Sequence, residues 1–205
     1  MSTENLSGII LAGGLSRRLG RNKAIENIEN KPLLSIVYDS IKPFVNELII
    51  VVNNKQRQEE LSFLKNAKFT IDKFNNSGSL GGIYTGLLKA NNEKAIIVAC
   101  DMPFISPSIL SLMISKIKSS IDIIIPETEG FKHSTHAIYS KSCIKVIKKN
   151  LDDNNLKISN IFNMCKTEII SEKEIFETEP CTKSFFNINN EMDLTKAKNL
   201  INKYD

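Results

Sequence analysis

The chain has 205 residues, of which 41% are hydrophobic and 24% charged, and a formal net charge of +4. These are ordinary values for a globular protein, and the length suits a single α/β domain over residues 1–205 whose core needs neither disulfides nor a structural metal. The small positive charge is mixed with acidic residues, which argues against nucleic acid as a partner, and no apolar run approaches the ~20 residues that would cross a membrane. Because the segment from Met1 to Gly8 lacks the basic and apolar regions of a signal peptide, we expect a cytoplasmic protein.

Short, continuous apolar runs rich in β-branched residues alternate with amphipathic segments along the chain. Runs of this kind are typical of strands covered on both faces, as in a mostly parallel sheet wrapped by helices. The expected strands are residues 7–11, 48–52, 95–99 and 121–125, with shorter candidates at 68–71 and 168–170. The pattern predicts a doubly wound α/β fold with helices on both faces of a central sheet.

Apolar residues at helical spacing predict helices between these strands. The expected helices are residues 33–42, 83–89, 107–118 and 191–202. Ser106 is an N-cap candidate with Pro107 at the first helical position, and Asn190 precedes the last helix. Residues 150–182 are less regular, with an amphipathic piece at 156–164.

The first expected strand runs directly into a glycine-rich, basic loop. A glycine pair, Gly13 and Gly14, is followed by Arg17, Arg18 and Lys23. Glycines let backbone N–H groups approach phosphate oxygens closely, and the cations neutralise the phosphate charge. The spacing is neither the dinucleotide fingerprint nor the P-loop. A glycine pair alone would indicate a surface turn, but three cations in the same loop favour a polyphosphate site.

Asp101 follows the expected strand at 95–99. Ligands of open α/β sheets bind at the carboxyl ends of the strands, so a carboxylate there is well placed to hold Mg²⁺ against phosphates. The alternative is that Asp101 caps the turn before Pro103.

Asp72 follows the strand candidate at 68–71 and precedes a glycine-rich segment at 75–82. The glycines of this segment would let the backbone lie against a ligand. The alternative is an ordinary loop before a helix that Ser79 caps.

Two histidines, His133 and His136, lie three residues apart in a segment that we expect to be extended. An odd spacing on a strand places the two rings on opposite faces, which disfavours a shared metal. Each is therefore a surface histidine, or one of them faces the substrate.

Asn187 and Asn189 follow an expected aromatic strand at 185–186 and share one of its faces. Either these amides complete a metal or phosphate site, or the segment only provides Asn190 as the cap of the last helix.

In this order the motifs resemble the molybdenum cofactor guanylyltransferase family, a branch of the nucleotidyltransferases. The matching stretches are LAGGLSRRLGRNKA at 11–24, KPLL at 31–34, GSLGGIYTGL at 78–87, CDMPFISP at 100–107 and FFNINNEMDL at 185–194. The resemblance implies a three-layer Rossmann-like nucleotidyltransferase fold with a mostly parallel central sheet. It also implies transfer of GMP from GTP to the terminal phosphate of molybdopterin carrying molybdenum, with release of pyrophosphate.

The resemblance extends to individual positions of the site. The nucleotide-binding residues that it implies, together with the glycine pair of the loop, are Leu11, Ala12, Gly13, Gly14, Lys23, Asn54, Asp72 and Asp101. Asn53 is a close rival of Asn54, and Asp101 is the implied Mg²⁺ ligand. Cytidylyl relatives tend to have LAAG where this chain has LAGG, so Gly13 indicates GTP, because a glycine would leave room for the larger purine.

The chain departs from the family pattern at two places. Asn22 stands where relatives usually have an aspartate before the lysine, and it has no carboxylate for an ion pair. Ser134 stands where relatives often have a proline after the histidine, so His133 receives no role.

The expected reaction is an in-line attack of a substrate phosphate oxygen on the α-phosphorus of GTP. Lys23 and Arg17 are the expected phosphate clamps and Asp101 the metal ligand, and an anionic nucleophile needs no general base. The rival hypotheses are cytidylyl or sugar-phosphate nucleotidyl transfer, and a non-catalytic module that binds nucleotide or molybdopterin. Transient contact with molybdopterin insertion proteins or molybdoenzyme chaperones is a further expectation.

Overall fold

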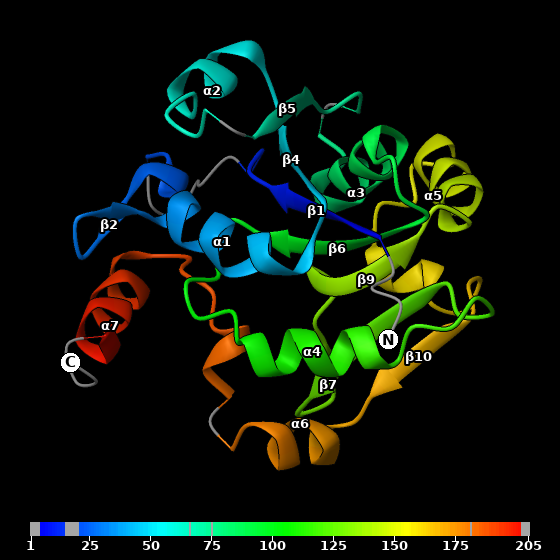
Figure 1. Cartoon of the computed structure of the whole chain (residues 1–205). Helices are drawn as coiled ribbons and strands as arrows, with labels where there is room; N and C mark the ends of the chain where they lie inside the picture. The colour runs from blue at the N-terminus through cyan, green and yellow to red at the C-terminus, as the bar shows by residue number, and fades with distance from the viewer. Residues whose placement is uncertain (1–4, 15–20, 66, 75, 181, 202–205) are drawn as a thin grey trace.

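A computed structural model describes residues 5–14, 21–65, 67–74, 76–180 and 182–201. It contains an eight-stranded mixed sheet (Figure 1), and a small hairpin formed by β2 and β3. The strands are β1 Leu6–Leu11, β2 Asn27–Ile28, β3 Lys31–Pro32, β4 Glu47–Val52, β5 Lys68–Ile71, β6 Lys94–Ala99, β7 Ile123–Thr128, β8 Phe131–Lys132, β9 His136–Ser140 and β10 Thr167–Ile170.

The main sheet has the strand order β10-β7-β9-β6-β1-β4-β5, with β8 paired to β7. Neighbours along this order are parallel except at β9, which is antiparallel to both β6 and β7. The chain passes from β1 through β4 to β5 on one side, and then returns to β6 on the other side of β1. The carboxyl ends of β1 and β6 therefore form a topological switch point, where doubly wound sheets bind their ligands.

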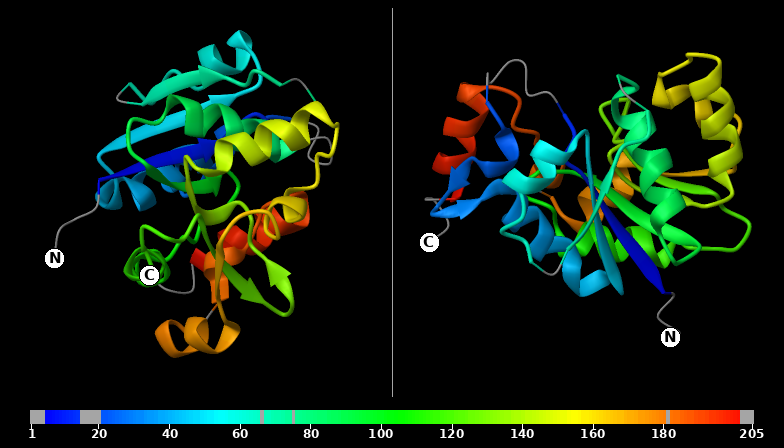
Figure 2. Two further views of the ribbon diagram at one scale, coloured as in Figure 1. Left: turned by 90° about the vertical axis from the view of Figure 1, so that its right-hand side faces the viewer. Right: turned by 90° about the horizontal axis from the view of Figure 1, so that it is seen from above.

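Helices cover both faces of the sheet, as the views of Figure 2 show. The α-helices are α1 Leu33–Ile41, α2 Lys55–Glu60, α3 Gly78–Lys89, α4 Pro107–Ser115, α5 Cys143–Asp152, α6 Glu172–Thr178 and α7 Glu191–Ile201. Short 3-10 helices are η1 Lys23–Ile25, η2 Lys42–Phe44, η3 Ile158–Ile161 and η4 Thr182–Phe185. One core cluster joins a sheet face to α1, α4 and α6, and a second joins the opposite face to α3 and α5. The predicted three-layer α/β architecture is confirmed.

The central strands form where the sequence predicts them because their β-branched side chains are buried on both faces. Ile9 of β1 is fully buried and lies opposite Ile49 and Ile97 of its two parallel neighbours. A Cβ on Gly86 of α3 would come within 2.6 Å of Cγ2 of Ile9. Glycine therefore lets α3 pack directly on β1, and this packing places the start of α3 beside the switch point.

The helix signals of the sequence are mostly confirmed. Ser106 caps α4, since its hydroxyl accepts a hydrogen bond of 3.4 Å from the N–H of Ile109. The helix expected after the glycine-rich segment starts earlier than predicted, because α3 begins at Gly78 within that segment, so Ser77 and not Ser79 is its cap residue. The amphipathic piece at 156–164 forms only the single turn η3.

The aromatic strand expected at 185–186 is wrong. Thr182–Phe185 is the 3-10 helix η4, followed by an irregular segment up to the start of α7. We call residues 184–190 the C-terminal strap. Strand propensity is overridden here because Phe185 packs on the rings of His133 and His136, with centroids 4.0 and 5.1 Å away, instead of joining the sheet.

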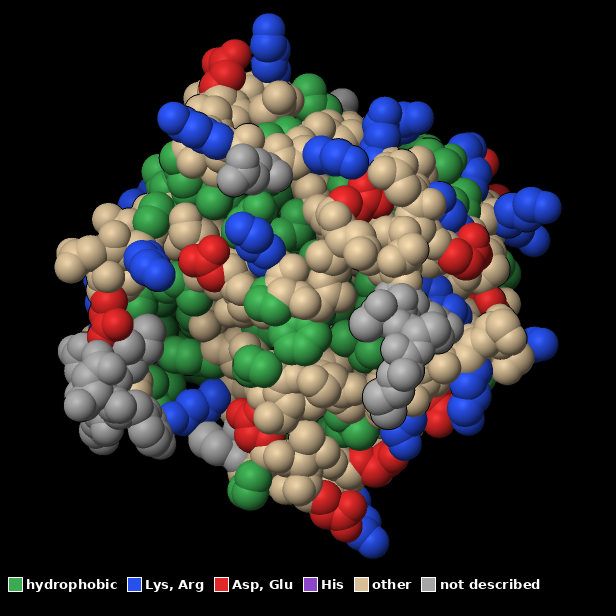
Figure 3. Space-filling model, viewed as in Figure 1, with side chains coloured by type: hydrophobic (Ala, Val, Ile, Leu, Met, Phe, Trp, Pro, Cys, Tyr) green, Lys and Arg blue, Asp and Glu red, His purple; other side chains and the backbone are tan. Residues whose placement is uncertain are grey.

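On the face shown in Figure 3, Lys and Arg side chains are interspersed with Asp and Glu among the described residues. Within the described ranges, no helix is long and apolar enough to span a membrane.

Candidate nucleotide-binding site

A cavity of about 750 Å³ opens at the carboxyl ends of β1, β4, β5 and β6. The predicted binding residues that line it are Leu11, Gly13, Gly14, Lys23, Asn54, Asp72 and Asp101. Ala12 is buried behind this wall, where its N–H donates a hydrogen bond of 2.8 Å to the carbonyl of Val51. Arg17, the other predicted phosphate clamp, lies outside the described residues. The fold thus brings together side chains from four strand ends that are distant in the sequence.

Lys23 and Asp101 form an ion pair at the edge of this cavity. Both side chains are largely buried, with 15% and 10% of their surface exposed. Lys23 opens the turn η1, whose N-cap is Asn22; the amide oxygen of Asn22 accepts a hydrogen bond of 3.1 Å from the N–H of Ala24. Asn22 therefore positions the lysine by capping, without the carboxylate that the family resemblance implies at this position.

The C-terminal strap braces the same ion pair through its backbone. The N–H of Ile188 donates to the carbonyl of Asp101 at 2.9 Å, and the carbonyl of Ile188 accepts from Nζ of Lys23 at 3.4 Å. The side-chain amide of Asn187 turns back to the carbonyl of Phe185, and the N–H of Asn189 donates to Asp193. Neither asparagine lines the cavity, so the backbone of Ile188 between them, and not their side-chain amides, contacts the lysine and the aspartate.

Asp101 has one oxygen in the ion pair and one oxygen that is buried without a partner. Oδ2 binds Lys23, while Oδ1 takes no hydrogen bond from the described residues. Buried carboxylate oxygens are normally paired, so this arrangement fits an oxygen that would coordinate a hard cation. The alternative role as a turn cap has no hydrogen bond to support it in the described part of the chain.

Cys100 precedes the aspartate and is buried beside it. Desolvation raises the pKa of its thiol to about 12, and the negative charge of Asp101 acts in the same direction. The thiol is therefore protonated at neutral pH and is no nucleophile.

Asn53 and Asn54 both line the cavity at the end of β4, but their amides differ. Asn54 is the N-cap of α2, and its Oδ1 accepts a hydrogen bond of 2.7 Å from the N–H of Arg57. The Oδ1 of Asn53 is buried and takes no hydrogen bond from the described residues. Asn53 is thus the one of the two whose acceptor atom is not already used by the fold.

Asp72 follows β5, and its N–H donates to the carbonyl of Val52 at 2.7 Å. Its Oδ1 accepts hydrogen bonds from the hydroxyl of Thr85 at 2.9 Å and from the N–H of Phe74 at 3.0 Å. Burial raises the pKa of the carboxyl above its ordinary value, and these hydrogen bonds offset part of the effect.

Gly13 and Gly14 differ in the space around them. A Cβ on Gly13 would lie 3.2 Å from the backbone nitrogen of Asn53, whereas a Cβ on Gly14 would meet nothing within 4 Å. Glycine at position 13 therefore lets the loop after β1 approach the loop after β4. That it also leaves room for the larger purine stays a prediction.

The spacing of the two histidines predicted that their rings point to opposite faces of a strand, and this prediction is wrong. His133 precedes β9 in a turn closed by the hydrogen bond from the N–H of His136 to its carbonyl, so the alternation of a strand does not apply. Both rings pack on Phe185, and Nε2 of His133 is 2.7 Å from the hydroxyl of Thr128. His136 is fully buried, which rules out a surface role and lowers its pKa to about 3. In the part of the chain that the structure describes, no group of three metal-ligating side chains is found.

Phe74, Asn76 and Ser77 also line the cavity, and no motif of the sequence indicated an individual role for them. Phe74 packs edge-to-face on Tyr84 of α3, with ring centroids 5.3 Å apart. In the sequence, the feature that indicates Phe74, Asn76 and Ser77 is their position between a strand followed by an aspartate and the glycine-rich start of a helix.

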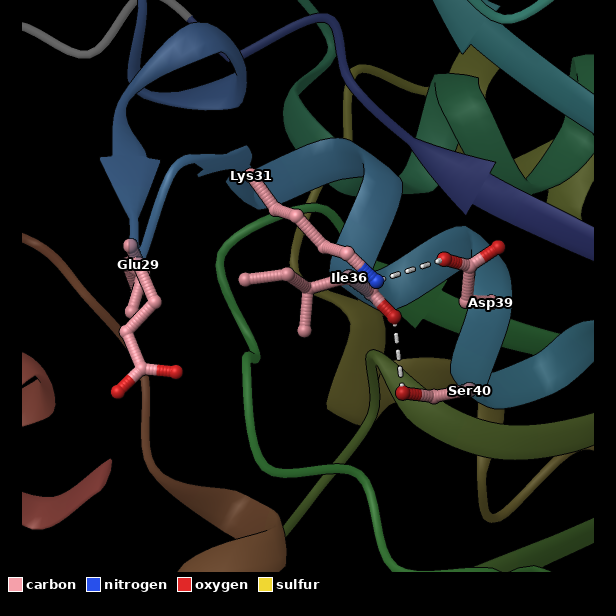
Figure 4. A pocket seen from close by; sticks show the side chains of 6 residues that line it. Glu29, Lys31, Ile36, Asp39 and Ser40 are labelled. Atoms are coloured by element: carbon pink, nitrogen blue, oxygen red, sulfur yellow. Dashed lines mark hydrogen bonds and ion pairs between the residues drawn. The ribbon is translucent and has the colours of Figure 1, made fainter. Parts of the chain in front are cut away.

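A second, smaller cavity of about 460 Å³ lies between the β2–β3 hairpin and α1 (Figure 4). Lys31 approaches Asp39 at 3.9 Å across it, and the hydroxyl of Ser40 donates to the carbonyl of Ile36. It shares no lining residue with the first cavity, and none of its lining residues lies at the carboxyl end of a strand of the main sheet.

A mostly parallel sheet with this order, and a cavity with an aspartate and a lysine at its switch point, define a protein of the nucleotidyltransferase fold. The chain belongs to the family described as the MobA-like NTP transferase domain, whose match covers residues 8–164.

Relatives over nearly the full length bear one name. A Desulfosudis oleivorans protein named "Molybdenum cofactor guanylyltransferase" is 36% identical over 94% of both chains. A Natranaerobius thermophilus protein named "Probable molybdenum cofactor guanylyltransferase" is 37% identical over 98% of both. The crystal structure of molybdopterin-guanine dinucleotide biosynthesis protein A from Archaeoglobus fulgidus superimposes with a TM-score of 0.85 at 25% identity, over 97% of this chain and 100% of that one.

Proposed function

We propose that the protein transfers GMP from GTP to the terminal phosphate of molybdopterin carrying molybdenum and releases pyrophosphate. The observation that carries the proposal is the buried Lys23–Asp101 pair at the switch point, because Oδ1 of Asp101 has no partner among the described residues and would bind a cation. The names of the full-length relatives support the choice of nucleotide and acceptor.

The phosphates of GTP bind at the end of β1. Backbone N–H groups near Gly13 and Gly14 and the ammonium of Lys23 neutralise the triphosphate, and Arg17 is a further clamp on sequence grounds. Asp101 would hold Mg²⁺, which supplies charge stabilisation on the reacting phosphate when bound. When the triphosphate binds, its negative charge releases Lys23 from Asp101. The ammonium can then turn to the phosphate that carries the developing charge.

The protein contributes alignment and electrostatics more than covalent chemistry. The attacking phosphate of the acceptor is already an anion, so no side chain has to remove its proton. The protonated thiol of Cys100 takes no part in the reaction. The C-terminal strap holds the lysine and the aspartate in register through Ile188.

The nucleoside end of GTP occupies the part of the cavity between the loops that follow β4 and β5. Asn53, whose Oδ1 needs a donor, is the better candidate than Asn54 for a contact with the nucleoside. Asp72 offers a second acceptor, and Phe74 offers an aromatic face. We further propose that the chain is a single nucleotidyltransferase domain that works in the cytoplasm and meets molybdopterin insertion proteins or molybdoenzyme chaperones transiently.

The test is pyrophosphate release from GTP, CTP, ATP and UTP, each with and without molybdenum-loaded molybdopterin. The proposal expects release from GTP only when the loaded acceptor is present, and loss of that release in Asp101→Ala. Release from CTP in preference to GTP would instead support a cytidylyltransferase. Binding of GTP without any release would support a non-catalytic module.

A further inference from the structure

Thr85 is a fully buried polar residue in the middle of α3, and it faces the loop that follows β5. Its hydroxyl donates to Oδ1 of Asp72 at 2.9 Å and accepts from the N–H of Lys73 at 3.1 Å. Because the Lys73 N–H can only donate, the hydroxyl hydrogen must point to the carboxylate. The threonine thereby fixes both the loop backbone and the carboxyl group.

Among the described residues, the carboxylate of Asp72 is held through only one of its two oxygens. The hydrogen bonds from Thr85 and from the N–H of Phe74 both end on Oδ1. Oδ2 lies 3.0 Å from the point that a Cβ on Gly81 would occupy, beside the first turn of α3. This turn borders the cavity through Gly78 and Gly82. The second oxygen is thus the one available on the ligand side.

We propose that Thr85 is a positioning residue for the nucleotide: it orients Asp72 so that Oδ2 accepts a hydrogen bond from a donor group of the nucleoside. The donor is an N–H of the purine base or a hydroxyl of the ribose. This inference rests on the proposed function, since it takes GTP as the ligand of the cavity.

The groups around Asp72 make the pKa of its carboxyl sensitive to the loss of the Thr85 hydroxyl. Thr85, Phe74 and Gly81 are uncharged, Lys73 follows it in the chain, and the ammonium of Lys148 from α5 lies 5.8 Å from the centroid of the Phe74 ring. The hydroxyl of Thr85 lowers the pKa of the carboxyl, which burial raises. Removal of the hydroxyl therefore moves the pKa of Asp72 upward.

The decisive variant is Thr85→Val, which keeps the shape of the side chain and removes the hydroxyl. We expect KM for GTP to rise about five- to tenfold while kcat changes by less than about twofold, an effect of the size of one ordinary intramolecular hydrogen bond. The pH below which GTP affinity falls should move upward. Thr85→Ser should restore both properties. Thr167→Val removes a hydroxyl that bonds the carbonyls of Phe162 and Cys165 outside the cavity, and is the matched control.

A double-mutant cycle separates positioning from general packing. In an Asp72→Ala background, Thr85→Val should cause no further loss of GTP affinity, because the group that it orients is gone. A full additional loss in that background, or an unchanged pH profile in Thr85→Val alone, would overturn the inference. Direct binding of GTP to these variants gives the same comparison even when the turnover assay fails, so failure of the proposed function remains distinguishable.

Two GTP analogues identify the donor. Inosine triphosphate lacks the 2-amino group, and 2′-deoxy-GTP lacks a ribose hydroxyl. The analogue that lacks the donor should bind with equal affinity to the wild type and to Thr85→Val. If Thr85→Val weakens GTP and both analogues by the same factor, the donor is the N1–H of the base or the 3′-hydroxyl, which all three share.

Discussion

Burial of His136 should make the protein less stable in mild acid by an amount that the structure determines. The ring is fully buried against Phe185, and desolvation lowers its pKa from 6.5 to about 3, with the backbone of Ser184 offsetting only part of this effect. The unfolded chain therefore takes up a proton below about pH 6.5 that the native protein refuses, so the free energy of unfolding falls as the pH falls. His133, whose pKa burial also lowers, contributes in the same direction.

The size of the effect at pH 5 depends little on the exact native pKa. For an unfolded pKa of 6.5 and any native pKa well below 5, the free energy of unfolding loses about 2 kcal/mol between about pH 8 and about pH 5. The loss is large beside a total stability of about 5–15 kcal/mol.

Urea unfolding of the wild type and of His136→Gln, followed by circular dichroism at both pH values, measures this contribution. Glutamine does not titrate, so the variant should lose about 2 kcal/mol less than the wild type on acidification, whatever its stability at high pH. His133→Gln measures in the same way the contribution of the neighbouring histidine, whose pKa burial also lowers. An equal loss of stability in the wild type and in His136→Gln would refute the reasoning.

Three further results are expected. Lys23→Ala should lower kcat for GMP transfer by about 10²–10³ because the charge that stabilises the reacting phosphates is removed, and a circular dichroism spectrum like that of the wild type should show that the fold is retained. Asn22→Asp should impair activity, because a carboxylate replaces the amide that donates a hydrogen bond of 2.9 Å to Glu60. The double variant Asn22→Asp/Glu60→Gln should recover activity, and no recovery would contradict this explanation. Gly86→Ala should lower the free energy of unfolding by about 1–3 kcal/mol in urea, since its methyl group meets Ile9, and unchanged stability would show that α3 can move away.

The sequence predicts the parts of the fold that depend on local burial. The continuous β-branched runs of β1, β4 and β6 form strands only when both faces are covered, so their composition indicates a central parallel sheet. Once these strands are placed, the carboxyl-edge rule brings Asp72 and Asp101 to one cavity.

The remaining features depend on contacts between distant residues. The pairing of Lys23 with Asp101 joins positions 78 residues apart, and no local pattern predicts that the aspartate keeps one oxygen free. The preference for Asn53 over Asn54 follows from a capping hydrogen bond that only the start of α2 reveals. The aromatic pair in the C-terminal strap has strand propensity, but stacking of Phe185 on His133 decides its conformation.

The backbone contacts of Ile188 have a consequence for the biosynthesis of the protein. One N–H and one carbonyl near the end of the chain hold the aspartate and the lysine that come from its middle and its beginning. A ribosome that has translated the chain up to Ile170 has already made every strand that the structure describes, yet Lys23 and Asp101 still lack their common brace. Products that terminate between Ile170 and Ile188 would therefore contain every described strand but lack the backbone groups that hold the lysine and the aspartate.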